Sequence, residues 1–470
     1  MKSQFKRVWW WIATGGAVVL LVCCVVLAFY PRAVGTNGIS QIAGNKAGNP
    51  RPVPFPTNGP VATNQSPPQP AASLSGPVRK GGWDVYPQPG SYVMALARDG
   101  AGNIWAGTEG NGVWKFDPHA TTNEWTQFTT TNGLGDDYCY SLAVDKQGRV
   151  WAGHLNHGVS VFNGTSWTNY DVPCGPIGER VFKIAVCPVD GDVWIGTSAG
   201  LTRYSAGKDE WINYTKGQSG NQTGPPHVGS YGETNAPGLP SDQISAIAFD
   251  AHGNIYVGTQ CDGIAMAGRA SDYSDWWQAP VADQKMPAYT GFGLPSKLIN
   301  DLLVTSDGTV YAATDGGLGL SRDNGKDWQF LRGGDFPDKM RGLAGGPPKG
   351  WSAGTLPKNL LPEDDITCLA EDDVGVVWAD FRQHGLLAVC GYSYQVLDRQ
   401  SAQETGGADY GRAILPMPDF RPWLASYGMG LLRTTEARRL LHIAVFKGDG
   451  PEAAANAPFP SPPARQTWRS

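Results

Sequence analysis

The sequence carries little charge, and the charge that it has is nearly balanced. Of its 470 residues 17% are charged, with 37 lysines and arginines against 42 aspartates and glutamates, for a formal net charge of −5. A nucleic-acid-binding protein needs a concentrated basic surface, and this balance does not supply one. Nucleic acid is therefore not an expected partner.

Charge is missing altogether between Val8 and Pro31, where the sequence reads VWWWIATGGAVVLLVCCVVLAFYP. About 23 helical residues at about 1.5 Å each span the roughly 30 Å hydrocarbon layer, so residues 8–30 are predicted to form a transmembrane signal anchor in the lipid bilayer. The basic residues of the stub 1–7 place the N-terminus in the cytoplasm. A cleaved signal peptide is the alternative. Under either interpretation the rest of the chain is expected to be extracytoplasmic, and periplasmic in a Gram-negative cell.

Acidic residues are absent from residues 31–80, which are rich in proline, glycine, asparagine and serine. No hydrophobic periodicity appears there, so this stretch is predicted to be a disordered linker. Residues 448–470 are predicted to be a disordered tail for the same compositional reasons. The folded part is expected to be residues 81–447.

Within the folded part the chain repeats one pattern seven times. The stretch NIWAGTEGNGVWKF, Asn103–Phe116, shows it: an aromatic residue, a small residue, Gly-Thr, a polar tip and another apolar run. The copies recur roughly every 45 to 65 residues, and repeats of short strands near this length are typical of a β-propeller. The aromatic anchors of the copies are Trp105, Trp151, Trp194, Tyr256, Tyr311, Trp378 and Trp423.

Each copy has the pattern of four strands. The first is apolar on both sides, as expected for a strand buried between neighbouring blades. An Asp-x-x-Gly turn leads to the second strand, whose aromatic ring can bury about 150–250 Å² between blades. A glycine two positions later lies on the same face and leaves room for the neighbouring blade. These glycines are Gly107, Gly153, Gly196 and Gly258.

The fold class predicted is all-β, a seven-bladed β-propeller of four-stranded antiparallel blades. Closing the ring requires one more strand for the seventh blade. WDVY at Trp83–Tyr86 and RLLHIAVF at Arg439–Phe446 are both candidates, and the pattern does not decide between them.

The stretches DAHGNIYVGT from Asp250 and AGNIWAGT from Ala101 resemble the repeat of the two-component regulator propeller family. The resemblance extends over about residues 81–447 through repetition. It implies the propeller fold and a sensing or binding role, because such propellers commonly form the extracytoplasmic part of histidine kinases and often respond to carbohydrate-derived signals. No kinase or receiver domain is expected in this chain, so the resemblance does not extend to phosphotransfer.

One face of the propeller is the expected binding face. The tips between second and third strands share it with the connections from one blade to the next, and all the long insertions fall in those connections. This face is predicted to be a polar funnel that takes a carbohydrate or a peptide. Polar tips of this kind also occur simply because they are solvated. The candidate ligand-binding residues are Glu109, Asn111, His154, His157, Gln260, Asp262, Asp315, Trp351, Arg382, His384 and Tyr427.

No catalytic residues, metal ligands or cofactor are predicted. The histidines lie on tips of different blades, whereas a zinc site needs three or four ligands within about 2.0–2.3 Å of the metal. Six cysteines outside the apolar segment permit disulfides in an oxidising compartment, with Cys174–Cys187 and Cys368–Cys390 the pairs nearest in sequence.

The sequence thus favours a membrane-anchored, non-catalytic sensory propeller that binds a carbohydrate, a peptide or a membrane or periplasmic partner protein. Two alternatives stay open, because a fold alone does not decide function. One is a propeller-fold lyase or glycoside-acting enzyme that uses His154, His157, Arg382 or His384. The other is a pure protein–protein scaffold, which predicts a broad apolar patch.

Overall fold

The computed structural model describes residues 76–435 except 81, 122–123, 217–221, 224–237, 283–287, 343–345, 348, 353–360, 374, 390–395 and 398–409. The described residues all belong to one compact unit, Asn58–Ser470. The predicted anchor 8–30 and the tail 448–470 lie outside them. No helix among the described residues is long and apolar enough to cross a membrane.

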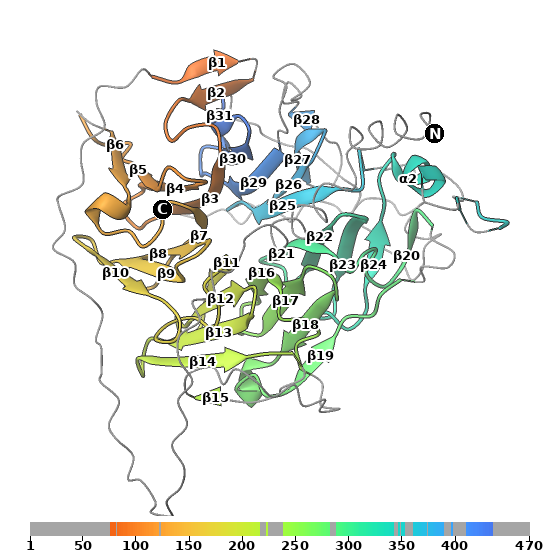
Figure 1. The fold of residues 1–470 in the computed structure, drawn as a ribbon. Coiled ribbons are helices and arrows are strands. Elements are labelled where there is room, and N and C mark those ends of the chain that lie inside the picture. The colour runs from red at the N-terminus through yellow and green to blue at the C-terminus, as the bar shows by residue number, and fades with distance from the viewer. Residues whose placement is uncertain are drawn as a thin grey trace, which may run out of the picture. The chain divides into compact units, whose positions relative to one another are not determined.

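Seven antiparallel sheets form the blades of a propeller (Figure 1). In each blade four strands follow one another in sequence order across the sheet, except in the seventh blade. The second strand is buried along its whole length in the first six blades, and in the seventh only its last residue, Tyr427, is half-buried. The first strands, which were predicted to be buried on both faces, contain half-buried residues as well. The strands of the first three blades are β3 (Val93–Arg98), β4 (Ile104–Thr108), β5 (Val113–Phe116) and β6 (Trp125–Phe128); β7 (Cys139–Val144), β8 (Val150–His154), β9 (Val159–Phe162) and β10 (Trp167–Tyr170); and β11 (Val181–Val186), β12 (Val193–Thr197), β13 (Gly200–Ser205) and β14 (Glu210–Tyr214).

The first strands form the inner ring. Each packs against the first strand of the next blade, and that of the seventh blade packs against β3, so the ring is closed. The seven-bladed propeller is therefore confirmed. The strands of the other blades are β16 (Ile244–Phe249), β17 (Ile255–Thr259), β18 (Ile264–Ala267) and β19 (Trp276–Gln278); β21 (Ile299–Val304), β22 (Val310–Thr314), β23 (Gly317–Ser321) and β24 (Gln329–Leu331); β25 (Ile366–Glu371), β26 (Val377–Phe381), β27 (Gly385–Val389) and β28 (Val396–Leu397); and β29 (Tyr410–Leu415), β30 (Trp423–Tyr427) and β31 (Gly430–Thr434).

The N-terminal candidate strand closes the ring. β2 (Trp83–Tyr86) pairs antiparallel with β31, with Trp83 opposite Thr434 and Tyr86 opposite Leu431. Figure 1 shows β2, near the red end of the colour scale, beside the blue β31. The competing stretch 439–446 lies outside the described residues.

Several elements extend the blades. β1 (Val78–Lys80), inside the last residues of the predicted linker, pairs with β2 at the outer edge of the seventh blade. β15 (Gln222–Thr223) and β20 (Thr290–Phe292) extend the third and fifth blades. The other elements are the short helix α2 (Phe336–Gly342) and the 3₁₀ turns η1 (Thr130–Asn132) and η2 (Arg269–Ser271).

The predicted packing of aromatic anchors and glycines between blades is confirmed. Trp105 of the first blade packs on Phe162 and Trp167 of the second, with ring centroids 5.6 and 6.5 Å away. A Cβ atom on Gly153 would lie 2.5 Å from Cγ1 of Val181, the first residue of β11. Only a residue without a side chain fits this position.

Candidate functional site

All seven first strands are irregular at the same point. The pairing of each with its second strand skips one residue, the second of the strand in six blades and the third in β29, a β-bulge at the end where the chain enters from the preceding blade. Bulges re-aim a side chain out of the sheet, so these positions form the mouth of the propeller on the predicted funnel face. The skipped residues are Met94, Tyr140, Phe182, Ser245, Asn300, Thr367 and Arg412.

A ladder of aromatic rings and one guanidinium crosses this face over the sixth, seventh and first blades. The ring of Tyr92 lies 4.9 Å from that of Tyr427, which stacks on Tyr410 at 5.4 Å and 21°. The guanidinium of Arg382 lies 4.5 Å from the centre of the Tyr410 ring. We call these four residues the tyrosine ladder. Tyr92, at its end, is 49% exposed.

The pairing of the strands places the ladder. Tyr410 begins β29 and is directly opposite Tyr427, which ends β30. Tyr427 also forms an isolated bridge with Tyr92, just before β3. Arg382 follows β26 and is anchored by Asp365, whose Oδ2 accepts a hydrogen bond from its Nε at 2.5 Å. The positions of the ladder residues are therefore set by the pairing of strand ends and by the bond of Arg382 to Asp365.

Polar groups border the ladder. The hydroxyl of Tyr140 donates a hydrogen bond to Oε1 of Glu109 at 3.3 Å. Burial, with the nearby Glu109 carboxylate, raises the pKa of Tyr140 and of Tyr427, so both phenols stay neutral donors at physiological pH. Arg412 is exposed beside Tyr410, with its guanidinium 6.0 Å from the ring centre. The site thus offers aromatic faces, hydroxyl donors and a cation.

Comparisons with known proteins agree with this fold. The family model "Two component regulator propeller" matches residues 87–110 and 238–260, which lie in the first and fourth blades. Two blades of this chain carry the two component regulator propeller repeat. No curated protein matches the chain.

Solved propellers share the architecture at low identity. The extracellular domain of a hybrid two component system from B. thetaiotaomicron gives a TM-score of 0.51 at 15% identity, over 74% of this chain and 40% of that chain. Virginiamycin B lyase from Staphylococcus aureus gives 0.50 at 10% identity, over 73% of this chain and 94% of that one. At these identities the likeness concerns the fold alone. This chain spans well under half of the B. thetaiotaomicron domain.

The structure brings three of the residues predicted from the repeat together: Glu109, Arg382 and Tyr427 all lie at or beside the ladder. Asn111 is exposed on the same tip as Glu109, and its amide donates to the carbonyl of Pro89 at 2.7 Å.

One predicted residue does not face the funnel. His154 is 0% exposed, its Nε2 lies 2.6 Å from Ser160 Oγ, and burial lowers its pKa to about 4. Its ring is a neutral part of the packing of the second blade. The expectation that His154 lines a binding surface is therefore corrected.

The remaining predicted residues lie on other tips and, for Trp351, in a connection between blades. Exposed His157 pairs with Asp171 at 3.3 Å, and His384 Nδ1 lies 3.4 Å from the buried Glu363. Trp351 packs edge-on against Phe336 of α2. Gln260 and Asp262 are half-buried on one tip, and Asp315 is exposed on the next.

Metal and disulfide chemistry find no support within the described residues. No group of three or more histidine, cysteine or acidic side chains there could hold a metal ion. Cys174 and Cys187, a pair that the sequence permits, are not bonded to each other, and Cys390 lies outside the described residues. The cysteines without a disulfide bond among the described residues are Cys139, Cys174, Cys187, Cys261 and Cys368.

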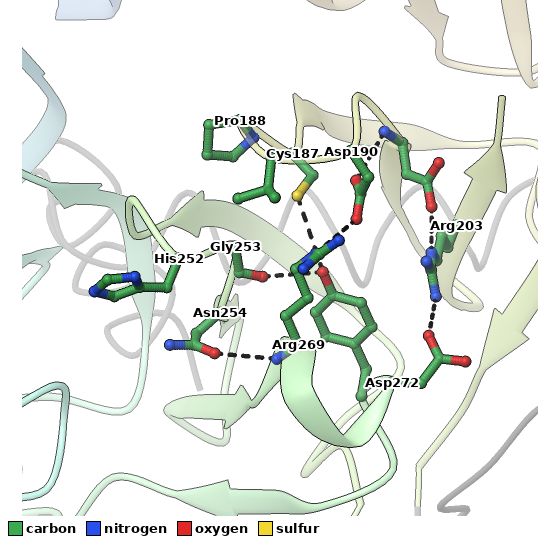
Figure 2. Close-up of polar contacts among 12 residues, drawn as sticks. Cys187, Pro188, Asp190, Arg203, His252, Gly253, Asn254, Arg269 and Asp272 are labelled. Carbon is green, nitrogen blue, oxygen red and sulfur yellow. Dashed lines mark hydrogen bonds and ion pairs between the residues drawn. The ribbon is translucent and has the colours of Figure 1, made fainter. Parts of the chain in front are cut away.

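The opposite face carries a different kind of polar cluster (Figure 2). Arg269 donates through Nε to Asp190 at 3.0 Å, which ties the fourth blade to the third. Arg203 of β13 bridges Asp192 at 2.7 Å and Asp272 at 2.6 Å. Each arginine in this cluster is committed to carboxylates of the turns, so we interpret it as a structural connection between blades.

Proposed function

We propose that the protein is a sensory propeller that binds a small ligand on the tyrosine ladder. The observation that carries this proposal is the ladder itself, in which residues of three blades stack at the mouth of the propeller. Stacked tyrosines present wide apolar faces and hydroxyl groups with little conformational freedom to lose, which suits recognition of small ring-shaped ligands. A carbohydrate or a peptide fits this chemistry.

The proposal includes the placement of the domain. The apolar segment 8–30 would hold the propeller on the outer side of the membrane, with the Pro-rich linker as a spacer. A signal would then pass to a membrane or periplasmic partner protein. Support comes from the two matched propeller repeats and from the resemblance of the fold to an extracellular domain.

Binding can be tested with residues 76–447 in a thermal-shift screen of neutral and acidic oligosaccharides and peptides. A ligand at about 100 times its dissociation constant stabilises the folded state by roughly 2.7 kcal/mol. We expect a shift that Tyr92→Ala and Tyr427→Ala remove. Phe292→Ala is the matched control, because Phe292 is an exposed aromatic residue on β20. A shift that survives both ladder variants, or a complete panel without a shift, would contradict the proposal.

An enzyme is the second candidate, and one observation favours it. His384 lies beside Glu363, whose pKa is raised by burial, and follows Arg382 by two residues in the chain. A histidine, an acid and an arginine are the groups that proton transfer uses. Turnover that is lost in His384→Ala and kept in Tyr427→Ala would favour this candidate over the sensor.

The scaffold reading receives less support. The large hydrophobic residues that are exposed within the described ranges lie on several blades instead of forming one rim: Val78, Tyr92, Tyr138, Val189 and Phe292.

A further inference from the structure

The charge of Arg412 is not paired with an acidic group in the described part of the chain. It is exposed, and its guanidinium makes no ion pair or hydrogen bond with a described residue. Its guanidinium lies 6.0 Å from the centre of the Tyr410 ring, and its charge also acts on the phenol of Tyr140. It therefore stands at the tyrosine ladder as an unpaired cation.

The other charges at the ladder are already committed. Arg382 is half-buried and paired with Asp365 through Nε and Oδ2. Glu109 accepts a hydrogen bond from the Tyr140 hydroxyl with one carboxylate oxygen, and its second oxygen is buried without a hydrogen-bond partner. Asp365 is thus paired with Arg382, and Glu109 is bonded to Tyr140 rather than to Arg412.

Arg412 also lacks the structural role of its counterparts. At the same bulge position, Ser245 Oγ donates to the carbonyl of Ile299 at 2.6 Å, and Asn300 Nδ2 donates to that of Ile366 at 2.7 Å. These bonds join one blade to the next. Arg412 donates no such bond, so ring packing does not explain why an arginine stands there.

A guanidinium presents a planar fork of donors that matches a carboxylate, and charge-assisted hydrogen bonds are about twice as strong as neutral ones. A guanidinium is also attracted to the face of an aromatic ring within about 6 Å. We propose that the ligand of the tyrosine ladder carries a carboxylate group, which pairs with Arg412 while the adjoining ring or apolar stem stacks on the tyrosines. This inference rests on the proposed binding function. The shared chemistry can come from an acidic sugar or from the C-terminus of a peptide.

Two matched pairs of probes separate the carboxylate from the rest of the ligand. Trigalacturonic acid is compared with neutral galactotriose, and a Gly-Tyr-Tyr peptide with a free C-terminus is compared with its amide. Calorimetry on residues 76–447, in about 50 mM salt, should show at least tenfold tighter binding of the acidic member in one pair. The pair that shows it identifies the source of the carboxylate.

Arg412→Gln should abolish this preference and leave binding of the neutral member unchanged, and Arg412→Lys should restore part of it. Because Arg412 is exposed, both variants should melt within a few degrees of the wild type. Equal binding of acid and neutral members, or a preference that persists in Arg412→Gln, overturns the inference while the proposed function stands. Absence of ladder-dependent binding of all four probes overturns both.

Discussion

Asp380 of β26 and Gly411 of β29 pack together with the large and the small residue exchanged, compared with the equivalent pairs between other blades. In the first four blades the second strand has a glycine that receives a bulky first residue of the next blade, as Gly258 receives Ile299. Between the sixth and seventh blades the carboxylate occupies the glycine position, and a Cβ on Gly411 would lie 2.5 Å from Asp380 Cγ. Asp380 also accepts the Gly411 N–H at 2.7 Å. The interface is thus filled from the opposite side.

This packing rule predicts that Gly258→Ala destabilises the propeller by about 1–3 kcal/mol, because the new Cβ would lie 2.5 Å from Ile299 Cγ2. The backbone at Gly258 is not left-handed, so the effect is one of volume. Gly207→Ala, where no atom lies within 4 Å of the added Cβ, is the control and should be nearly neutral. Urea unfolding of Gly258→Ala, Ile299→Ala and the double variant should show that the two costs are not additive. Strictly additive costs would contradict the rule.

A second rule links the aspartate of the first turn to the tryptophan six residues later. Trp151 Nε1 donates to Asp145 Oδ2 at 2.8 Å, and Trp105 makes the same bond to Asp99 at 2.9 Å. In the third blade the turn is one residue longer, Cys187 occupies the aspartate position, and Trp194 Nε1 is buried without a hydrogen-bond partner.

Trp151→Phe should therefore cost about 1–2 kcal/mol more stability than Trp194→Phe. Both substitutions remove the same atoms from buried rings between blades, but only the first breaks a hydrogen bond, and the second removes an unsatisfied N–H. Comparing the two denaturation midpoints tests this difference. Equal losses, or a larger loss for Trp194→Phe, would show that the Asp–Trp bond contributes little.

Much of the fold was predictable because the same sequence pattern recurs in every blade. The aromatic anchor, the glycine position and the number of blades follow from side-chain periodicity and volume, which are local properties. The choice of Trp83–Tyr86 as the closing strand depends on pairing with β31, more than 300 residues away in sequence, and the apolar pattern is shared by its competitor.

The site was only partly predictable. His154 was expected on a tip, yet it occupies the position of Thr108 and Thr259, which are both buried and bonded to a glycine carbonyl. An alignment of the repeats places His154 with these buried threonines, and it could therefore have predicted that His154 is buried. Tyr410 and Arg412 were missed because they lie in a first strand, where buried residues were expected. The β-bulge that turns side chains of this strand toward the mouth cannot be recognised in a single sequence.

An ion pair spans two blades that are not neighbours. Lys183 of β11 and Asp301 of β21 approach to 2.7 Å, and Asp301 also accepts the Leu369 N–H at 3.0 Å. Asp301→Ala should cost about 2–4 kcal/mol, because it leaves a buried N–H and a partly buried ammonium without partners. Asp301→Asn, which keeps an acceptor for Leu369, should cost about 1 kcal/mol.

Chemical denaturation of the two Asp301 variants separates the charge from the hydrogen bond. The exposed pair Arg341–Asp338 supplies the control, since its aspartate is 82% exposed and Asp338→Ala should change stability by less than about 1 kcal/mol. If Asp301→Ala is as mild as Asp338→Ala, the contact between the two blades does not stabilise the ring.

The buried carboxyl of Asp364 should make stability depend on pH. Burial raises its pKa to about 6, against the opposing effects of the Gly333 N–H and Arg332. A raised pKa means that the folded state binds the proton more tightly than the unfolded chain, so this stabilisation is complete below about pH 4 and is lost as pH rises through 6. Relative to Asp364→Asn, the wild type should lose at most about 3 kcal/mol between pH 4 and pH 7. Urea melts of both proteins at half-unit pH steps measure that difference, and the effects of the other carboxyls cancel from it.

Asp323 supplies a comparison of opposite sign, because its carboxylate accepts hydrogen bonds and its pKa is lowered. Relative to Asp323→Asn, the stability of the wild type should fall as the pH decreases, at more acidic pH than for Asp364. Parallel pH profiles for wild type and Asp364→Asn would show that Asp364 does not titrate in this range.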